Sequence, residues 1–225
     1  MARQEYRRRL DKLRTDVCAM ADLVLDRYDD ALEAYETGNE ELAQTVIEGD
    51  HDINEQYLDL EGNCVELLAL QQPVAGDLRF IASSFKIVTD IERIGDLATN
   101  LAGYGVEDAE PLLPLEDVRD IGETAGTMVE DAIAVYETGK AEGTWEIAAR
   151  DDDLDEACQN ASERIVRELI ANDPSTLTDT EIEVRLADVS RTLLLIRDIE
   201  RVGDHAVNIC ARTLYMAEND DGLIY

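Results

Sequence analysis

The sequence predicts an all-α protein built from two tandem three-helix bundles, with six long helices related by internal pseudo-symmetry. Three observations predict this fold. Two segments of the chain recur in the same order. Apolar residues follow helical spacing, and no long stretch has the period-2 alternation of a half-buried strand. The 225 residues include only 4 Pro, 13 Gly and, as aromatic residues, 1 Trp, 8 Tyr and 2 Phe, a composition that suits helices better than a β-sandwich.

The recurring segments indicate a tandem duplication. The segment DALEAYETG at residues 30–38 returns as DAIAVYETG at residues 131–139, which is a spacing of 101 residues. The heptapeptide DIERIGD at residues 90–96 returns as DIERVGD at residues 198–204, a spacing of 108 residues. Internal repetition at a fixed period indicates repeated structural units, so each copy is expected to form the same arrangement of helices.

Helix-ending residues divide each copy into three helices. Gly38 and Gly139 follow the first helix of each copy, where glycine accepts the left-handed conformation of a helix C-terminus. Gln72-Pro73 and Asp173-Pro174 end the second helices, because the residue before proline avoids the helical conformation. The third helix of each copy carries the repeated heptapeptide.

The boundary between the copies is expected in the acidic, proline-containing stretch from Glu107 to Pro114. The expected repeats are therefore residues 1–108 and residues 109–225. Near the end of the second copy, Thr178 and Glu181 form the pattern of a capping box, which predicts that the last helix begins there.

The charge of the chain excludes several classes of partner. It carries 52 acidic and 20 basic residues, a formal net charge of -32. Such a charge repels nucleic acid phosphates and anionic lipid, so we expect no nucleic acid partner and no direct membrane insertion. Abundant carboxylates with only three lysines, Lys12, Lys86 and Lys140, are typical of a halophilic protein from a high-salt-adapted organism, because salt screens the repulsion.

The cysteines and the N-terminus predict a cytoplasmic protein. Cys18, Cys64, Cys158 and Cys210 are scattered among apolar residues without a CxxC pair, which predicts buried, reduced thiols. The N-terminal residues are basic but lack the apolar region of a signal peptide. No stretch approaches the ~20 apolar residues that a membrane-spanning helix needs.

The third helix of each copy has a distinctive acidic face. Its apolar seam has the helical 4-3 spacing in both copies: Ile87, Ile91, Ile94, Ala98, Leu101, and Leu195, Ile199, Val202, Ala206, Ile209. Opposite this seam stand three polar residues at i, i+4 and i+8, which form an acidic ladder: Glu92, Asp96, Asn100, and Glu200, Asp204, Asn208. Asp90 and Asp198 point away from these ladders.

A second apolar patch lies just upstream, on the same side of the helix as the ladder. Its members are Ile81, Phe85 and Val88 in the first copy and Val189, Leu193 and Ile196 in the second. Two interpretations remain at this point: the patch covers a partner surface, or it is core between the two bundles.

An aspartate interrupts the apolar seam of the second helix in both copies. Asp50 and Asp151 occupy equivalent seam positions, and Asn54 and Asp155 follow four residues later. An unpaired carboxylate in an apolar seam is costly unless it reaches the bundle edge or meets a cation. Each copy thus offers one oxygen pair on its second helix and another on its third.

These oxygen pairs fit a cation site, and they also have a simpler interpretation. Side chains at i and i+4 are close enough to bind one ion or to bridge two, and a cation offsets the repulsion between like charges. With 52 acidic residues, however, acidic pairs are expected on any exposed helix. Repetition at equivalent positions and the two seam-breaking aspartates raise the odds of the metal interpretation, and both interpretations stay open at this point.

The two heptapeptides closely resemble the signature of the PhoU family of phosphate-uptake regulators. The resemblance extends over nearly the whole chain, as two copies of three helices each. It implies a non-catalytic negative regulator that binds multinuclear iron or zinc clusters, or other divalent cations, on E(D)xxxD motifs. It also implies a cytoplasmic homodimer that works with the phosphate ABC transporter, through its ATPase subunit, and with a sensor kinase. The implied metal ligands are Asp50, Asn54, Glu92, Asp96, Asp151, Asp155, Glu200 and Asp204.

The first copy departs from the family pattern. Asn54 stands where the motif has an acid, and Leu97 stands where the second copy has His205. The first copy is therefore expected to hold metal less tightly. Whether His205 joins the site or only flanks it stays open, as does a ligand role for His51.

Catalysis is not expected from this sequence. The Glu48-x-x-His51 spacing resembles that of ferritin-like di-metal bundles, but Val202 stands three residues before the other histidine, His205. The chain has no Gly-x-Ser-x-Gly elbow and no glycine-rich phosphate loop. The alternative to a regulator is a metal-free helical adaptor whose acidic surface is only an adaptation to high salt.

Overall fold

The structure is a computed structural model that describes residues 2–70, 73–105, 112–171 and 178–224. These residues form six α-helices and no strand, so the predicted all-α fold is confirmed. The helices are α1 (Ala2–Thr37), α2 (Glu40–Leu70), α3 (Ala75–Gly105), α4 (Leu115–Thr138), α5 (Thr144–Ala171) and α6 (Asp179–Glu218).

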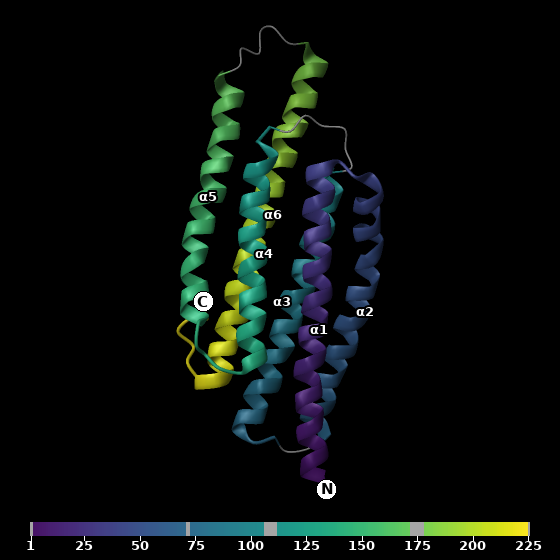
Figure 1. The fold of residues 1–225 in the computed structure, drawn as a ribbon, viewed down its shortest axis with the longest axis vertical. Coiled ribbons are helices and arrows are strands. Elements are labelled where there is room, and N and C mark those ends of the chain that lie inside the picture. The colour runs from purple at the N-terminus through teal and green to yellow at the C-terminus, as the bar shows by residue number, and fades with distance from the viewer. Residues whose placement is uncertain (1, 71–72, 106–111, 172–177, 225) are drawn as a thin grey trace.

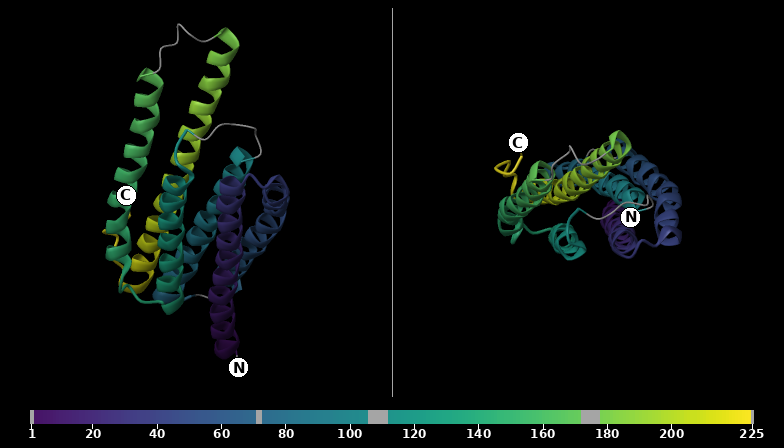
Figure 2. Two further views of the ribbon diagram at one scale, coloured as in Figure 1. Left: turned by 45° about the horizontal axis from the view of Figure 1, so that its top comes forward. Right: turned by 90° about the horizontal axis from the view of Figure 1, so that it is seen from above.

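The two copies join through their third helices. α3 and α6 pack against each other in the middle of the molecule (Figures 1 and 2). α1 and α2 complete the bundle around α3, α4 and α5 complete the bundle around α6, and α1 also contacts α4. In the described residues, no helix is both long and apolar enough to cross a membrane.

Helix ends follow the sequence signals where the structure describes them. Gly38 and Gly139 have φ values of 64° and 67°, the left-handed conformation that glycine adopts without steric penalty. Thr178 and Glu181 form the predicted capping box at the start of α6. The predicted ends at residue 72 and at residues 173–174 lie outside the described residues, as does the predicted division between residues 108 and 109.

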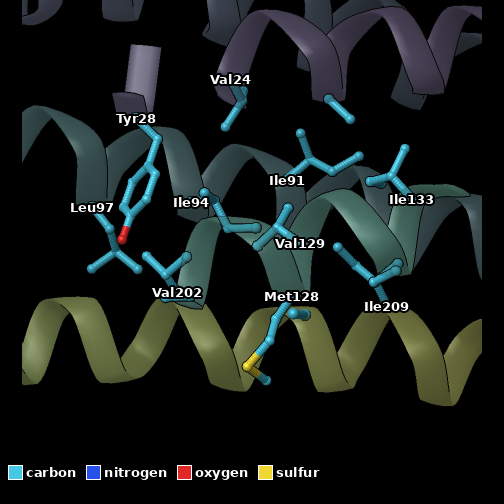
Figure 3. Packing of buried hydrophobic residues seen from close by; sticks show 14 of the residues in the cluster. Val24, Tyr28, Ile91, Ile94, Leu97, Met128, Val129, Ile133, Val202 and Ile209 are labelled. Carbon is cyan, nitrogen blue, oxygen red and sulfur yellow. The ribbon is translucent and has the colours of Figure 1, made fainter. Parts of the chain in front are cut away.

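The predicted seams form the core. All five seam residues of α3 are at most 1% exposed, as are those of α6, and Figure 3 shows side chains from α1, α3, α4 and α6 meeting in this core. Most of the second apolar patch is buried as well: Ile81, Val88 and Ile196 are at most 2% exposed and Val189 is 8% exposed. Phe85 and Leu193 are partly buried and pack against the core. This patch therefore belongs to the core, and the interpretation as a partner surface is wrong.

The two bundles differ at one end because α1 has 36 residues and α4 has only 24. The start of α1 covers the end of the α2–α3 pair with Tyr6, Leu10 and Leu13, which are at most 9% exposed. Among the described residues, no segment covers the α5–α6 pair in the same way, and Figure 1 shows this pair continuing beyond α4. We call this end of α5 and α6, residues 162–171 and 179–188, the overhang.

The sequence of the overhang matches its exposure. Leu67 is buried in α2, and the equivalent position in α5 carries Glu168, which is exposed. Phe80 is buried in α3, and the equivalent position in α6 carries Asp188, which accepts a hydrogen bond from Arg191 at 3.1 Å. Charged residues thus replace core residues where α4 does not extend along α5 and α6.

Candidate functional site

The structure brings the four candidate residues of the first copy to one face of the α2–α3 pair. Asn54 on α2 donates a hydrogen bond from Nδ2 to Oδ2 of Asp50 at 2.7 Å. Partial burial raises the pKa of Glu92 on α3, and the negative charges of Asp96 and Asp50 raise it further. Burial likewise raises the pKa of Asp96, with Asp50 adding to the shift. The carboxylates of the two helices therefore lie close enough to repel each other.

The second copy repeats this arrangement with four carboxylates. Burial raises the pKa of Asp151 to about 6, and the charges of Asp155, Asp204 and Glu200 are among the neighbours that add to it. The pKa values of Asp155 and Glu200 are raised in the same way, by burial and then by neighbouring carboxylates. This set contains no amide and has the stronger mutual repulsion.

One oxygen of the second set has no partner. Oδ1 of Asp151 is buried and makes no hydrogen bond in the described part of the chain. It lies against α6 at Gly203, where the absence of a side chain allows α5 to come close. A buried acceptor without a donor is destabilising, so this carboxylate gains from any cation that reaches it.

The donor chemistry of both sets fits a metal ion, but the present side-chain positions do not enclose one. Carboxylate and amide oxygens are ligands of hard divalent cations. The buried Oδ1 of Asp151 has no hydrogen-bond donor, so a cation would stabilise it. Within residues 2–70, 73–105, 112–171 and 178–224, no three His, Cys, Asp or Glu side chains stand together in a metal-holding geometry. Side-chain rotation toward the ion is therefore required.

The aspartate that opens each heptapeptide makes contacts that the sequence did not reveal. Asp198 is fully buried on α6, and its Oδ2 accepts hydrogen bonds from the Tyr104 hydroxyl at 2.9 Å and from Asn100 Nδ2 at 3.3 Å. Its Oδ1 accepts a hydrogen bond from Arg197 at 2.9 Å. We call Asp198, Tyr104 and Asn100 the Asp198 cluster.

A matching arrangement surrounds the aspartate of the first copy, and its partners come from the second copy. Oδ1 of Asp90 on α3 lies 2.9 Å from Nδ1 of His205 and accepts a hydrogen bond from Asn208 Nδ2 at 3.3 Å. We call Asp90, His205 and Asn208 the Asp90 cluster. In both clusters the aspartate comes from one copy and its asparagine partner from the other.

These contacts concern one expectation and one question that the sequence left open. Asn100 and Asn208 were expected to extend the acidic ladders, but each donates to the aspartate of the other copy. His205 contacts Asp90 instead of turning to Asp204. One sequence signal accompanies these contacts: an aspartate and an asparagine stand ten residues apart in both copies, Asp90 with Asn100 and Asp198 with Asn208. His51 is exposed on α2.

Two arginines adjacent to the ladders moderate the repulsion between carboxylates. Arg93 offsets part of the rise in the pKa of Glu92 and Asp96, and Arg201 offsets part of the rise in the pKa of Asp96. Neither arginine forms an ion pair in the described residues. Both arginines therefore act on the carboxylates at longer range than a direct ion pair.

The thiols are not activated as nucleophiles. All four cysteines are free, and three of them are buried. Burial raises the pKa of Cys18 and Cys64 to about 11 and that of Cys158 and Cys210 to about 12. Thiolates, not thiols, are the reactive form, so these residues serve packing.

Known proteins show similarity along nearly the whole chain. A family model described as the PhoU domain matches twice, at residues 17–104 and 118–213. A "Phosphate-specific transport system accessory protein PhoU homolog" of Pseudomonas putida is 32% identical over 97% of this chain and 82% of its own length. A "Phosphate-specific transport system accessory protein PhoU homolog 1" of Thermotoga maritima is 31% identical over 94% of this chain and 88% of its own length.

Solved structures are similar in fold as well. The crystal structure of PhoU from Pseudomonas aeruginosa has a TM-score of 0.87 and 31% identity, and the similarity covers 96% of this chain and all of that one. The phosphate transport system regulatory protein PhoU from Streptococcus pneumoniae has a TM-score of 0.86 and 26% identity, over 96% of this chain and 98% of that one.

Proposed function

The chain belongs to the PhoU family, and from this membership we propose that it is an accessory regulator of phosphate transport. The observation that carries the proposal is the family match itself, which falls once on each repeat. The relatives named as accessory proteins of a phosphate-specific transport system support it, because their similarity extends over 97% and 94% of this chain.

In this proposal the protein is a non-catalytic negative regulator of phosphate uptake. Its partners are the ATPase subunit of the phosphate ABC transporter and a sensor kinase, and it acts in the cytoplasm as a homodimer. Two observations favour a binding role over nucleophilic catalysis. The raised pKa values of Cys18 and Cys158 keep these thiols protonated, and His205 contacts Asp90. These groups are not arranged for nucleophilic catalysis.

The proposal includes cation binding at both ladders. Asp50, Asn54, Glu92 and Asp96 supply the first site, and the second consists of Asp151, Asp155, Glu200 and Asp204. Iron or zinc, or another divalent ion, neutralises these carboxylates when bound. The raised pKa values in both sets and the unpartnered Oδ1 of Asp151 support this part of the proposal.

A second candidate is a metal-free helical adaptor. It is favoured by one observation: the described His, Cys, Asp and Glu side chains do not converge on a common point in threes. Elemental analysis of protein purified without chelator separates the two candidates. Bound iron, zinc or manganese that decreases by the share of the second site in an Asp151→Asn, Asp204→Asn variant supports the regulator, whereas metal-free protein supports the adaptor.

Phosphate uptake in the host tests the regulatory role. Deletion of the gene is expected to raise uptake in phosphate-rich medium, and the wild-type gene is expected to restore the lower rate. A gene encoding the Asp151→Asn, Asp204→Asn variant should restore it only in part, because the second site is lost. Unchanged uptake after deletion would contradict the proposal.

A further inference from the structure

The two asparagine–aspartate contacts cross between the repeats in a reciprocal way. Asp198 belongs to α6 but is bonded by Tyr104 and Asn100 of α3. Asp90 belongs to α3 but is contacted by His205 and Asn208 of α6. α3 and α6 therefore hold each other through the aspartates that open their heptapeptides, Asp90 and Asp198.

Each of these carboxylates lies two residues before a candidate ligand. Asp198 precedes Glu200, and Asp90 precedes Glu92. Successive residues of a helix differ by 100° around its axis, so a contact that fixes the rotation of α6 at Asp198 also fixes the direction of Glu200 and Asp204. Those two side chains must face α5 to act together with Asp151 and Asp155.

We propose that each repeat positions the cation-binding carboxylates of the other repeat. The Asp198 cluster sets the rotation of α6 and thus the site between α5 and α6, although two of its three residues belong to the first repeat. The Asp90 cluster does the same for the site between α2 and α3. This inference rests on the proposed cation-binding function, and it adds Tyr104 and Asn208 as positioning residues.

The burial of Asp198 makes the effect large enough to measure. Asp198 is 0% exposed, and hydrogen bonds to a buried carboxylate are stronger than neutral ones. The Tyr104 hydroxyl contributes such a bond, and burial together with this bond to Asp198 raises the pKa of Tyr104 to about 12. Loss of a group that orients metal ligands typically weakens metal affinity on the order of tenfold or more.

Manganese binding to single-site proteins provides the main test. An Asp96→Asn background leaves only the α5–α6 site, and an Asp204→Asn background leaves only the α2–α3 site. Tyr104→Phe is expected to weaken Mn²⁺ binding on the order of tenfold in the first background. In the second background its effect should stay within about twofold, because α6 supplies no ligand to the α2–α3 site. Asn208→Ala should show the opposite selectivity.

A matched control separates positioning from lost stability. The Tyr28 hydroxyl donates a buried hydrogen bond to the Gly122 carbonyl at 3.0 Å, between α1 and α4. Tyr28→Phe therefore removes a comparable bond that does not involve the central pair of helices. It should lower the melting temperature and leave Mn²⁺ affinity unchanged at both sites. Equal losses at both sites with Tyr104→Phe, or no loss at either, would overturn the inference.

A metal-free measurement decides the question even if the parent protein binds no manganese. Asp155→Cys and Asp204→Cys, in a chain with Cys18→Ser, report through a short bismaleimide whether α6 presents residue 204 to α5. Tyr104→Phe should reduce the cross-linking yield, and Tyr28→Phe should not. An unchanged yield contradicts crossed positioning. Absent Mn²⁺ binding with a reduced yield refutes the proposed cation sites and keeps the positioning role.

Discussion

Oδ1 of Asp151 lies 3.1 Å from the point that a Cβ atom on Gly203 would occupy, and a methyl group of Leu154 lies still closer to that point. The first repeat has a milder version, in which two methyl groups of Ile53 lie 3.1 and 3.2 Å from the equivalent point on Gly95. The second and third helices of each repeat thus approach each other closely beside the candidate ligands, and the approach depends on glycine.

Alanine at this glycine is expected to destabilise the protein despite its better helix propensity. Gly203→Ala should gain up to about 1 kcal/mol from propensity but force Leu154 aside, which costs about 1–3 kcal/mol in a packed core. Gly62→Ala is the matched control, because nothing lies within 4 Å of its added Cβ; it should stabilise by about 1 kcal/mol. Urea unfolding at molar salt measures both, and stabilisation by Gly203→Ala would show that the approach is not tight.

Leucine in place of Asp151 is expected to stabilise the metal-free protein. The substitution restores an apolar residue between Ile147 and Leu154, which are at most 5% exposed, and it removes the unpartnered oxygen. We expect a gain on the order of 1 kcal/mol in the free energy of unfolding, with loss of metal from the α5–α6 site. Urea unfolding in chelator and elemental analysis check the two parts separately. A destabilised metal-free variant would mean that Asp151 has a structural partner.

Asp204→Ala is expected to lower bound metal while leaving the fold intact. The Asp204 side chain is exposed and faces away from the seam of Leu195, Ile199 and Val202. Removing it also relieves part of the repulsion that, after burial and together with Asp155, raises the pKa of Glu200. The melting temperature of the metal-free protein should therefore stay the same or rise slightly. Unchanged metal content, measured by elemental analysis at molar salt, would remove Asp204 from the ligand set.

The raised pKa of Asp151 predicts a pH dependence of stability. Burial and neighbouring carboxylates raise this pKa from 3.8 to about 6, so the folded state binds more protons than the unfolded state between these values. The protonated Asp151 therefore contributes to the stability of the folded state at low pH. This contribution is lost as the pH rises through about 6.

Comparison with Asp151→Asn isolates this contribution from the overall charge. Because the asparagine does not titrate, it should stabilise the metal-free protein more at pH 7 than at pH 5, by about 1 kcal/mol after allowance for partial exposure. Urea unfolding of both proteins at the two pH values measures this difference. An equal effect at both pH values would place Asp151 in an ordinary solvated environment.

Stability should also increase with salt. The formal net charge of -32 produces self-repulsion that is screened when the Debye length falls from about 30 Å at 0.01 M to about 3 Å at 1 M salt. The melting temperature of metal-free protein is expected to rise over this range in potassium chloride. A flat dependence would show that the acidic surface is not an adaptation on which the fold relies.

Most of the fold follows from local signals in the sequence. Gly38, Gly139 and the Thr178 capping box mark helix ends through backbone geometry and nearest neighbours, which a sequence displays directly. The seam of Ile87, Ile91 and Ile94 follows from helical spacing alone. The overhang was not foreseen, because it depends on the difference in length between α1 and α4.

The candidate site was predictable in part. The pairs at i and i+4 place Glu92 beside Asp96 on any helix, and the two interruptions of the second-helix seam indicated Asp50 and Asp151. The roles of Asp90 and Asp198 could not be read in this way, because their partners lie about a hundred residues away on another helix. Only the packing of α3 against α6 brings those side chains together.

The overhang has a consequence for how the molecule opens. Segments with little packed core open locally at a free energy well below that of global unfolding. No residue of 166–171 or 179–188 is buried, whereas the matching end of the first repeat lies under Tyr6 and Leu10. Amide hydrogens of the overhang should therefore exchange with solvent long before those of the α2–α3 end. Two repeats that arose by duplication have thus become a rigid unit and a unit whose far end can unwind by itself.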